Sequence, residues 1–369
     1  MRLHDRYFFR ELLTPMAICL GGFLVFWASF FFFTELEHMR EASLHFVESL
    51  EYAVAMMPGF FITVLPITLL LALLYALTHH ARHNEITALR AAGVGLWRLC
   101  APYFIVGLAT TGIYFVLNEI VVPRCTGWSE EILSRHVQKP VNANAKPKGF
   151  SNRQANRVWQ FGAYNPATVT MINPIVTWTS ADRVAHVIRA ARAQLTNSVW
   201  MFYDAQFLVR TNQQAGLAKD FFTNAIAMPA FEETAERIRL ELKFNDAQTL
   251  RASRSADIPL FELWTYLWHH PELTGEDANR LRTKFHGRLA APFTCLVVVL
   301  IAIPFGAQPG RRNLFFGVAG SIFIAFAFFV LQSVGMALGA GGHLPGWLAA
   351  WLPNMIFAVT GIWLIFRIR

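Results

Sequence analysis

The chain is poor in charged residues. Only 15% of its 369 residues are Asp, Glu, Lys or Arg, whereas a soluble globular protein carries about 25%. Apolar residues make up 54% of the chain, and 33 Phe and 11 Trp are among them. One soluble core does not need so many large apolar side chains, so lipid is the expected solvent for much of the surface. The net charge of +8 then favours anchoring at anionic lipid over binding of nucleic acid.

The motifs of several enzyme classes are also missing. The sequence contains no G-x-x-x-x-G-K-[ST] loop for nucleotide phosphates, no H-E-x-x-H zinc motif and no G-x-S-x-G nucleophile motif. His79 and His83 are one helical turn apart, but the sequence offers them no clear third ligand, so no metal site is predicted. The four Cys residues lack zinc-site spacing and are expected to be small buried hydrophobes. We therefore predict a protein that is not an enzyme and has no cofactor of its own.

Long apolar runs are abundant instead. A helix needs about 20 mostly apolar residues to span a bilayer. The first run is too long for the apolar core of a signal peptide and no A-x-A site follows it, so it is predicted to remain as a span. Six stretches qualify as spans: 13–34, 53–78, 100–120, 288–306, 315–339 and 347–366.

Basic residues in the short loops indicate the orientation of these spans. With the N-terminus in the cytosol, the short outer loops contain only Arg40. The cytoplasmic loops and ends then contain ten Arg residues: Arg2, Arg6, Arg10, Arg82, Arg90, Arg98, Arg311, Arg312, Arg367 and Arg369. Because Lys and Arg concentrate in cytoplasmic loops, both termini are predicted to be cytoplasmic.

The long segment 121–287, between the third and fourth spans, is predicted to be a β-rich domain on the outer side. From about 155 to 245, runs rich in β-branched and aromatic residues alternate with Asn, Pro and Gly, which indicates a β-sandwich or jelly roll. The run 237–244 alternates apolar and polar residues and is predicted to be a strand. Residues 257–270 have the spacing of an amphipathic helix with a Trp-rich face, which predicts a helix at the membrane surface.

The predicted fold class is thus a membrane α-helical bundle of six transmembrane helices, arranged 3 + 3, with an inserted β-jelly-roll or β-sandwich domain. Three regions follow from this reading. Residues 1–120 contain the first three spans and a cytoplasmic helix at about 84–99, residues 121–287 form the β-rich domain and its amphipathic helix, and residues 288–369 contain the last three spans.

The cytoplasmic segment 84–99 contains the most specific polar feature. It has helical spacing, with Glu85 near its start and Arg90 on its polar face. A short helix of this kind, parallel to the membrane, is suited to being held by a cytosolic partner. An ordinary polar loop, in which Glu85 merely favours the positive end of a helix, is the alternative.

Two further groups of residues are candidates for lipid contact. Arg binds phosphate with two parallel hydrogen bonds, so basic residues beside the fourth span suit a lipid headgroup, although generic snorkelling is the alternative. Phe residues on one face of the first and fifth spans would form an apolar cavity for acyl chains, or would simply face lipid. The headgroup candidates are Arg40, Arg280, Arg282, Lys284 and Arg288, and the cavity candidates are Phe23, Phe26, Phe30, Phe33, Phe316, Phe323 and Phe326.

Small residues at helical spacing mark faces where another helix can approach closely. In the fifth span, Gly317, Ser321 and Ala325 are four residues apart, and Gly335 and Gly339 repeat this spacing. We expect close helix packing at both places.

Five motifs, in this order, resemble the LptF/LptG (YjgP/YjgQ) permeases of the lipopolysaccharide exporter. The resemblance extends over nearly the whole chain. Its parts are RYFFRELL at 6–13, PITLLLALL at 66–74 with NEITALRAAG at 84–93, the segment from Leu117-Asn118 to Pro123, the segment from RLAAP at 288–292 to Ile303-Pro304, and the segment from Leu344-Pro345 to WLPN at 351–354.

The resemblance implies a permease subunit of an ABC transporter in the bacterial inner (cytoplasmic) membrane, with its β domain in the periplasm. Two such permeases pair around a cavity, and a cytosolic LptB-type ATPase dimer, which binds the ATP and Mg, docks on their coupling helices at the position of Glu85. Lipopolysaccharide enters between span one of one permease and span five of the other. It then passes through the jelly rolls to LptC and the periplasmic bridge protein, for outer-membrane biogenesis.

Other functions remain open at this point. The alternatives are a permease of another ABC class, exporting a lipoprotein or another lipid, and a non-transporting membrane scaffold. The chain also departs from the family pattern, because Phe32, Phe33 and Thr34 occupy the outer end of the first span where some members have lysine.

Overall fold

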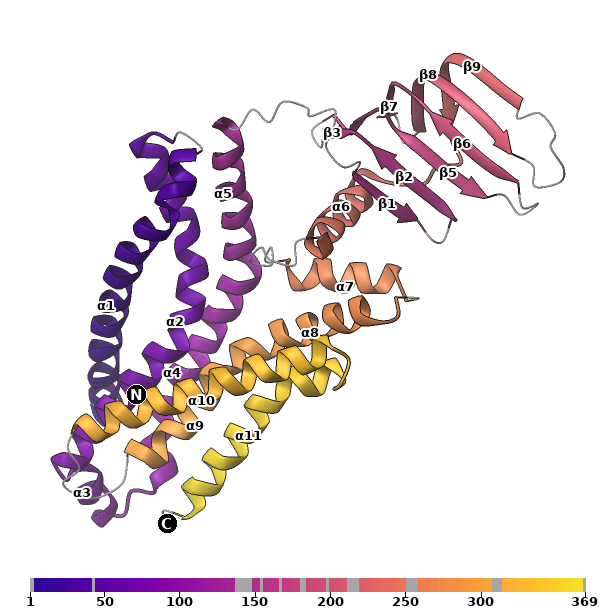
Figure 1. Cartoon of the computed structure of the whole chain (residues 1–369). Helices are drawn as coiled ribbons and strands as arrows, with labels where there is room; N and C mark the ends of the chain where they lie inside the picture. The colour runs from indigo at the N-terminus through magenta and orange to yellow at the C-terminus, as the bar shows by residue number, and fades with distance from the viewer. Residues whose placement is uncertain are drawn as a thin grey trace. The chain divides into compact units, whose positions relative to one another are not determined.

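The chain forms two compact units, one made of Met1–Val137 with Asp257–Arg369 and one made of Gln138–Ala256. The first unit is helical, and the second is mostly a β-sheet (Figure 1). The computed structural model describes residues 3–41, 44–136, 148–152, 155–165, 168–179, 184–196, 199–210, 219–249, 258–271, 273–306 and 314–367.

The helical unit contains long apolar helices joined by short connections. Its helices are α1 (Leu3–Glu41), α2 (Phe46–Arg82), α3 (Glu85–Ala91), α4 (Leu96–Val116), α5 (Val122–His136), α7 (Leu260–His269), α8 (Glu276–Ala290), α9 (Thr294–Gly306), α10 (Leu314–Ala340) and α11 (Gly346–Arg367). A π-helical turn, Leu117–Val121, joins α4 to α5, and a 3₁₀ turn, Ala291–Phe293, joins α8 to α9.

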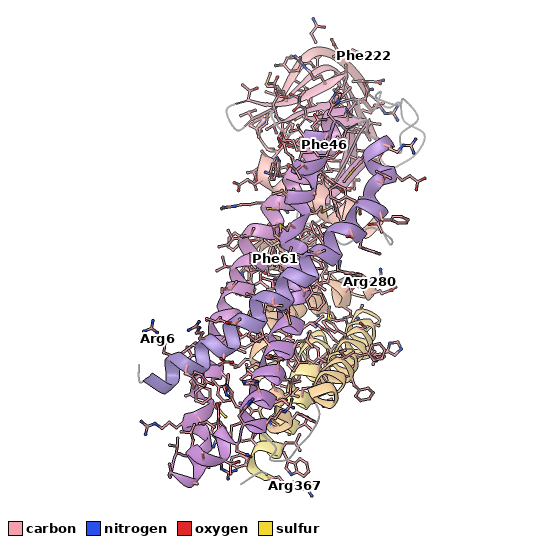
Figure 2. The ribbon with its side chains drawn as sticks, turned by 90° about the vertical axis from the view of Figure 1, so that its left-hand side faces the viewer. Arg6, Phe46, Phe61, Phe222, Arg280 and Arg367 are labelled. Carbon is pink, nitrogen blue, oxygen red and sulfur yellow. The ribbon has the colours of Figure 1, made fainter. Side chains whose placement is uncertain are left out.

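Six helical stretches in the described residues are long and apolar enough to cross a membrane. They are Arg6–Glu37, Phe46–Arg82, Trp97–Ser129, Ala278–Gly306, Ile322–Ala340 and Gly346–Arg367. This confirms the predicted six-span bundle. Figure 2 shows Arg6 and Arg367 toward one end of the unit and Phe46 toward the other, so the two chain ends of this unit lie at the same end of the spans.

The core of the helical unit lies around α2. In its most apolar stretch 61% of the residues are buried, against 6% in α1 and 17% in α10. Leu69, Leu73 and Leu77 of α2 pack with Leu12 of α1 and Val299 of α9. The outer faces of α1 and α10 therefore remain open to lipid or to another protein.

Glycine allows α10 and α11 to approach closely. A Cβ atom added to Gly335 would lie 2.6 Å from the carbonyl oxygen of Ala349, and one added to Gly339 would lie 2.6 Å from the Ala349 Cβ. The predicted close packing at these two glycines is confirmed. Ala325 packs against the core, whereas the surroundings of Gly317 and Ser321 lie outside what the structure describes.

The second unit is built on one curled antiparallel sheet, which gives it a jelly-roll-like form (Figure 1). Its strands run in the order β1-β2-β5-β6-β8-β7-β4-β3, and β9 also pairs with β8. The strands are β1 (Lys148–Asn152), β2 (Arg157–Phe161), β3 (Ala163–Asn165), β4 (Thr170–Ile172), β5 (Ile175–Thr179), β6 (Ala185–Arg189), β7 (Arg192–Thr196), β8 (Val199–Arg210) and β9 (Lys219–Met228).

The long strand β8 holds the two arms of this sheet together. Its first half pairs with β7 and its second half pairs with β6. Between the halves, Asp204 has a φ of 50°, a left-handed conformation that Asp adopts more readily than most residues. Buried aromatic side chains such as Trp159, Trp200 and Phe202 fill the core of the unit.

The prediction of a strand at 237–244 is wrong, because these residues lie in helix α6 (Ala235–Thr249). Ile238, Glu241 and Phe244 are buried, and their spacing of three residues places them on one helical face. The segment is also rich in Glu, Arg, Leu and Lys, which favour helix. Its pattern of apolar and polar residues is compatible with both the two-residue period of a strand and the 3.6-residue period of a helix.

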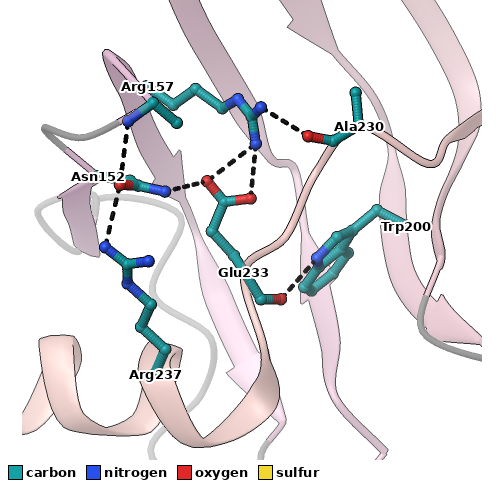
Figure 3. A network of polar contacts seen from close by, with 7 residues as sticks. Asn152, Arg157, Trp200, Ala230, Glu233 and Arg237 are labelled. Carbon is teal, nitrogen blue, oxygen red and sulfur yellow. Dashed lines mark hydrogen bonds and ion pairs between the residues drawn. The ribbon is translucent and has the colours of Figure 1, made fainter.

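A buried carboxylate ties the start of α6 to the sheet (Figure 3). The Glu233 side chain is fully buried, and Nη1 of Arg157 donates to both of its oxygens, at 3.2 and 2.9 Å. Nδ2 of Asn152 donates to Oε1 at 2.8 Å, and the indole N–H of Trp200 donates to the Glu233 carbonyl at 3.0 Å. The network therefore joins β1, β2 and β8 to the segment that enters the helix.

Candidate functional site

Helix α3 is a seven-residue helix between two spans, and Glu85 is its first residue. Asn84, immediately before it, has a φ of 57°, and Gly93, after its end, has a φ of 82°. Both turns use left-handed backbone, which Gly and Asn tolerate better than other residues. The helix is shorter than the predicted range 84–99, because the chain turns after Ala91 and α4 begins at Leu96.

Both oxygens of the Glu85 carboxylate have partners on the adjacent spans. Nδ1 of His80, on α2, lies 2.7 Å from Oε2, and the hydroxyl of Tyr7, on α1, donates to Oε1 at 3.3 Å. The His80 side chain is fully buried, while Glu85 is 32% exposed. We call Tyr7, His80 and Glu85 the α3 anchor. Sequence reasoning identified Glu85 and missed both partners. Tyr7 is the second residue of the RYFFRELL motif, and His80 directly follows His79.

Arg90, the second predicted coupling residue, lies near the end of α3 and does not join this cluster. It lines a groove of about 370 Å³ with Gly93, Trp97 and the last turn of α11, which supplies Ile365 and Phe366. The centroids of the Trp97 and Phe366 rings are 6.5 Å apart. The groove therefore opens on the same end of the bundle as α3 and the end of α11.

The predicted headgroup residues have different surroundings at the other end of the spans. Arg288 is internal: its Nη2 donates to the Asn118 carbonyl at 3.0 Å, and its Nε lies 3.6 Å from Oε1 of Glu119. Arg280 pairs with Glu276, one turn away on α8. Arg282 is exposed, Lys284 is half-buried, and Arg40 is exposed near the end of α1.

The amphipathic helix predicted at 257–270 is confirmed as α7. Oε2 of Glu119 accepts a hydrogen bond from the backbone N–H of Leu260 at 2.6 Å, which ties the first residue of α7 to the π-helical turn. Phe261, Trp264 and Trp268 are exposed on this helix. An exposed aromatic face of this kind suits the interfacial region of a bilayer.

The predicted cavity residues lie mostly on exposed faces of α1 and α10. The chain by itself does not enclose them, since Phe33 is 88% exposed and Phe323 is 72% exposed. Phe26, Phe30 and Phe326 are also exposed, and Phe23 is half-buried. The side chain of Phe316 lies outside the described residues.

The comparison with protein families identifies the family of this chain. The model of the family described as lipopolysaccharide export system permease LptF/LptG matches residues 6–367. The chain belongs to the LptF/LptG family. A comparison with curated proteins finds no match. Membership of the LptF/LptG family makes the chain a transport permease rather than an enzyme, and the family match covers both the six-span bundle and the inserted jelly-roll-like unit.

Proposed function

We propose that this chain is one of two paired permease subunits that extract lipopolysaccharide from the bacterial inner membrane and pass it to a periplasmic bridge. The observation that carries the proposal is the LptF/LptG match over residues 6–367. The six spans with an inserted jelly-roll-like unit support it. In this proposal the β unit lies in the periplasm, and α3 and both termini lie in the cytoplasm, as the distribution of Arg residues favours.

The energy comes from a separate subunit in this proposal. Exposing the acyl chains of a lipid to water costs about 0.8 kcal/mol for each CH₂ group, so moving several chains out of a membrane requires an external source of free energy. The sequence lacks a phosphate-binding loop. We therefore assign ATP and Mg to an LptB-type ATPase dimer that docks at α3, with Glu85 and Arg90 in the docking region.

The second permease covers the open faces of α1 and α10. Because only 6% and 17% of the residues in their most apolar stretches are buried, these helices must face lipid or another subunit. The exposed Phe side chains on both helices suit the acyl chains of lipopolysaccharide, which would enter between α1 of one permease and α10 of the other. LptC and the bridge protein would then receive the lipid.

Purification from native membranes tests this function. The expected result is a complex of this chain with a second permease and an ATPase, in which mass spectrometry detects lipopolysaccharide. In proteoliposomes, the complex should transfer lipopolysaccharide to a bridge protein only with hydrolysable ATP, and an ATPase-inactive complex is the control. Another bound lipid or a lipoprotein would indicate a different export class. Hydrolysis without movement of any lipid would indicate a scaffold.

A further inference from the structure

We infer that Tyr7 and His80 are positioning residues that hold Glu85 against α1 and α2, so that α3 moves together with these two helices. The motivating observation is that each oxygen of the Glu85 carboxylate has a partner, the exposed Tyr7 of α1 on one and the buried His80 of α2 on the other. The role of this link in transport rests on the proposed function. The link itself depends only on the geometry of the chain.

Helix α3 needs contacts of this kind to keep its place. A helix of seven residues is not stable in water by itself, so packing against the rest of the protein must hold it. Ile86 is its one buried residue, and Leu89 is partly buried against the bundle core. The two hydrogen bonds of Glu85 add directional contacts at the first residue, where α3 leaves α2.

His80 makes the stronger of these contacts. At 2.7 Å, its Nδ1 is at the distance of a charge-assisted hydrogen bond to a carboxylate. The imidazole is fully buried and lies edge-on to Phe8, with ring centroids 4.7 Å apart. Because Phe8 comes from α1, the His80 ring is held between α1 and the carboxylate. Removing the Glu85 carboxylate would leave the buried Nδ1 of His80 without its hydrogen bond.

Beside His80, a second buried polar side chain lies near Phe8: Tyr103, on α4. Its ring lies 6.0 Å from that of Phe8. Among the described residues, Nε2 of His80 and the hydroxyl of Tyr103 are buried without a hydrogen-bond partner. Buried polar atoms are nearly always paired, so a rearrangement of the α3 anchor that gives either atom a partner would gain a hydrogen bond.

The α3 anchor connects the docking helix to the most exposed span. Along its most apolar stretch, α1 has few buried residues, so contacts near its ends have a large share in positioning it. Tyr7 provides one such contact, and it bonds to the first residue of α3. A cytosolic partner that displaces α3 therefore displaces the nearby ends of α1 and α2 as well. In the proposed exporter, this connects nucleotide hydrolysis to the open Phe face of α1.

Hydrogen–deuterium exchange on the full chain in nanodiscs tests the link without any assumption about transport. Tyr7→Phe removes one hydroxyl, and His80→Phe removes the ring nitrogens while keeping an aromatic ring beside Phe8. Because one hydrogen bond contributes about 1 kcal/mol, we expect amide exchange in residues 85–91 to be roughly threefold to tenfold faster in Tyr7→Phe, and faster still in His80→Phe.

The matched control is Tyr75→Phe. Tyr75 is on α2 near the same end and is 40% exposed, like Tyr7, but its ring stacks on His79. Losing its hydroxyl should therefore leave the exchange of α3 unchanged. If Tyr7→Phe exchanges like the wild type, the inference is overturned. This holds even if His80→Phe fails to fold, because the tyrosine variant is the conservative one.

A double-mutant cycle tests the role in coupling. With the ATPase bound, Tyr7→Phe should keep ATP hydrolysis and lower the lipid released per ATP at least threefold. In a Glu85→Ala background, with enough ATPase added to saturate the weakened complex, the same change should add little, because Tyr7 acts through the Glu85 carboxylate. If the two substitutions lower the lipid released per ATP independently, so that their effects multiply in the double variant, this role is overturned. If the wild-type complex moves no lipid, the proposed function fails, and the exchange experiment still decides whether the α3 anchor exists.

Discussion

Arg288 on α8 forms an ion pair with Glu119 in the π-helical turn, with 3.6 Å between Nε and Oε1. Only 13% of the Arg288 side chain and 11% of the Glu119 side chain are exposed. The second oxygen of Glu119 accepts the N–H of Leu260, and Nη2 of Arg288 donates to the Asn118 carbonyl. The pair thus connects α8, α7 and the joint between α4 and α5. It gives Arg288 a structural role that its position beside the fourth span did not reveal.

Replacing Arg288 with Gln should destabilise the helical unit. The change leaves the carboxylate of Glu119 buried without its cation, and breaking a buried ion pair in this way costs about 3–5 kcal/mol. Thermal unfolding of the detergent-solubilised chain should show a clearly lower midpoint. The control is Arg282→Gln, six residues earlier on α8, where the side chain is exposed and the midpoint should barely move. Equal midpoints for the two variants would refute the structural role.

Arg282 is the better test of headgroup contact. Its guanidinium is exposed on the helix that continues into the fourth span, so it is available to a lipid phosphate. Reversing the charge with Arg282→Glu should reduce photocrosslinking of lipopolysaccharide to the complex without unfolding it. Arg367→Glu, at the other end of the bundle, is the matched control and should crosslink like the wild type. Unchanged crosslinking in Arg282→Glu would favour simple snorkelling of this side chain.

Glu233→Gln should destabilise the β unit and leave the helical unit intact. The substitution keeps the shape of the side chain but removes the negative charge that Arg157 needs, and Arg157 is only 13% exposed. Loss of one member of a buried pair costs about 3 kcal/mol or more. Limited proteolysis of the full chain, followed by mass spectrometry, should show faster cleavage within residues 148–249. Glu232→Gln changes an exposed neighbour and should be cleaved at the wild-type rate, and the same rate for Glu233→Gln would contradict this account.

Much of the fold can be predicted from the sequence, because some signals are averaged over many residues. The apolar runs of the six spans extend over about twenty residues, so single polar positions do not hide them. The amphipathic period of α7 is similarly clear. At 237–244, however, Leu240 and Leu242 complete an alternating pattern while Ile238 and Phe244 also suit a helical face. Packing of α6 beside the sheet decides between the two, and a local pattern does not contain that information.

The candidate site is less predictable than the fold, because its contacts join distant parts of the sequence. Tyr7 and Glu85 are 78 residues apart, and Arg288 and Asn118 are 170 residues apart. Glu85 was recognisable as an acidic residue at the start of a short helix. The burial of His80, which decides where that carboxylate points, depends on how α1 packs against α2 and has no local signature.

Glu85→Ala should weaken binding of the ATPase more than Tyr7→Phe or His80→Phe does. It removes the charge at the predicted docking helix and also releases α3 from both Tyr7 and His80. Truncating one partner of a charge pair that docking buries costs about 2–5 kcal/mol, so if Glu85 forms such a pair, the ATPase recovered with the affinity-tagged chain should fall at least tenfold. Glu276→Ala, on α8, is the control. Full recovery of the ATPase with Glu85→Ala would remove this residue from the docking surface.

The open face of α1 gives a last prediction, which separates a lipid route from mere contact with the bilayer. Phe30→Ala and Phe33→Ala together remove two exposed rings, so the stability of the single chain should hardly change. If this face contacts acyl chains inside a paired permease, the lipopolysaccharide that copurifies with the complex should fall severalfold. The control is Ile18→Ala, which changes a 70% exposed residue of the same helix outside the Phe cluster. A double variant that retains as much lipopolysaccharide as this control would show that the rings only face the bilayer.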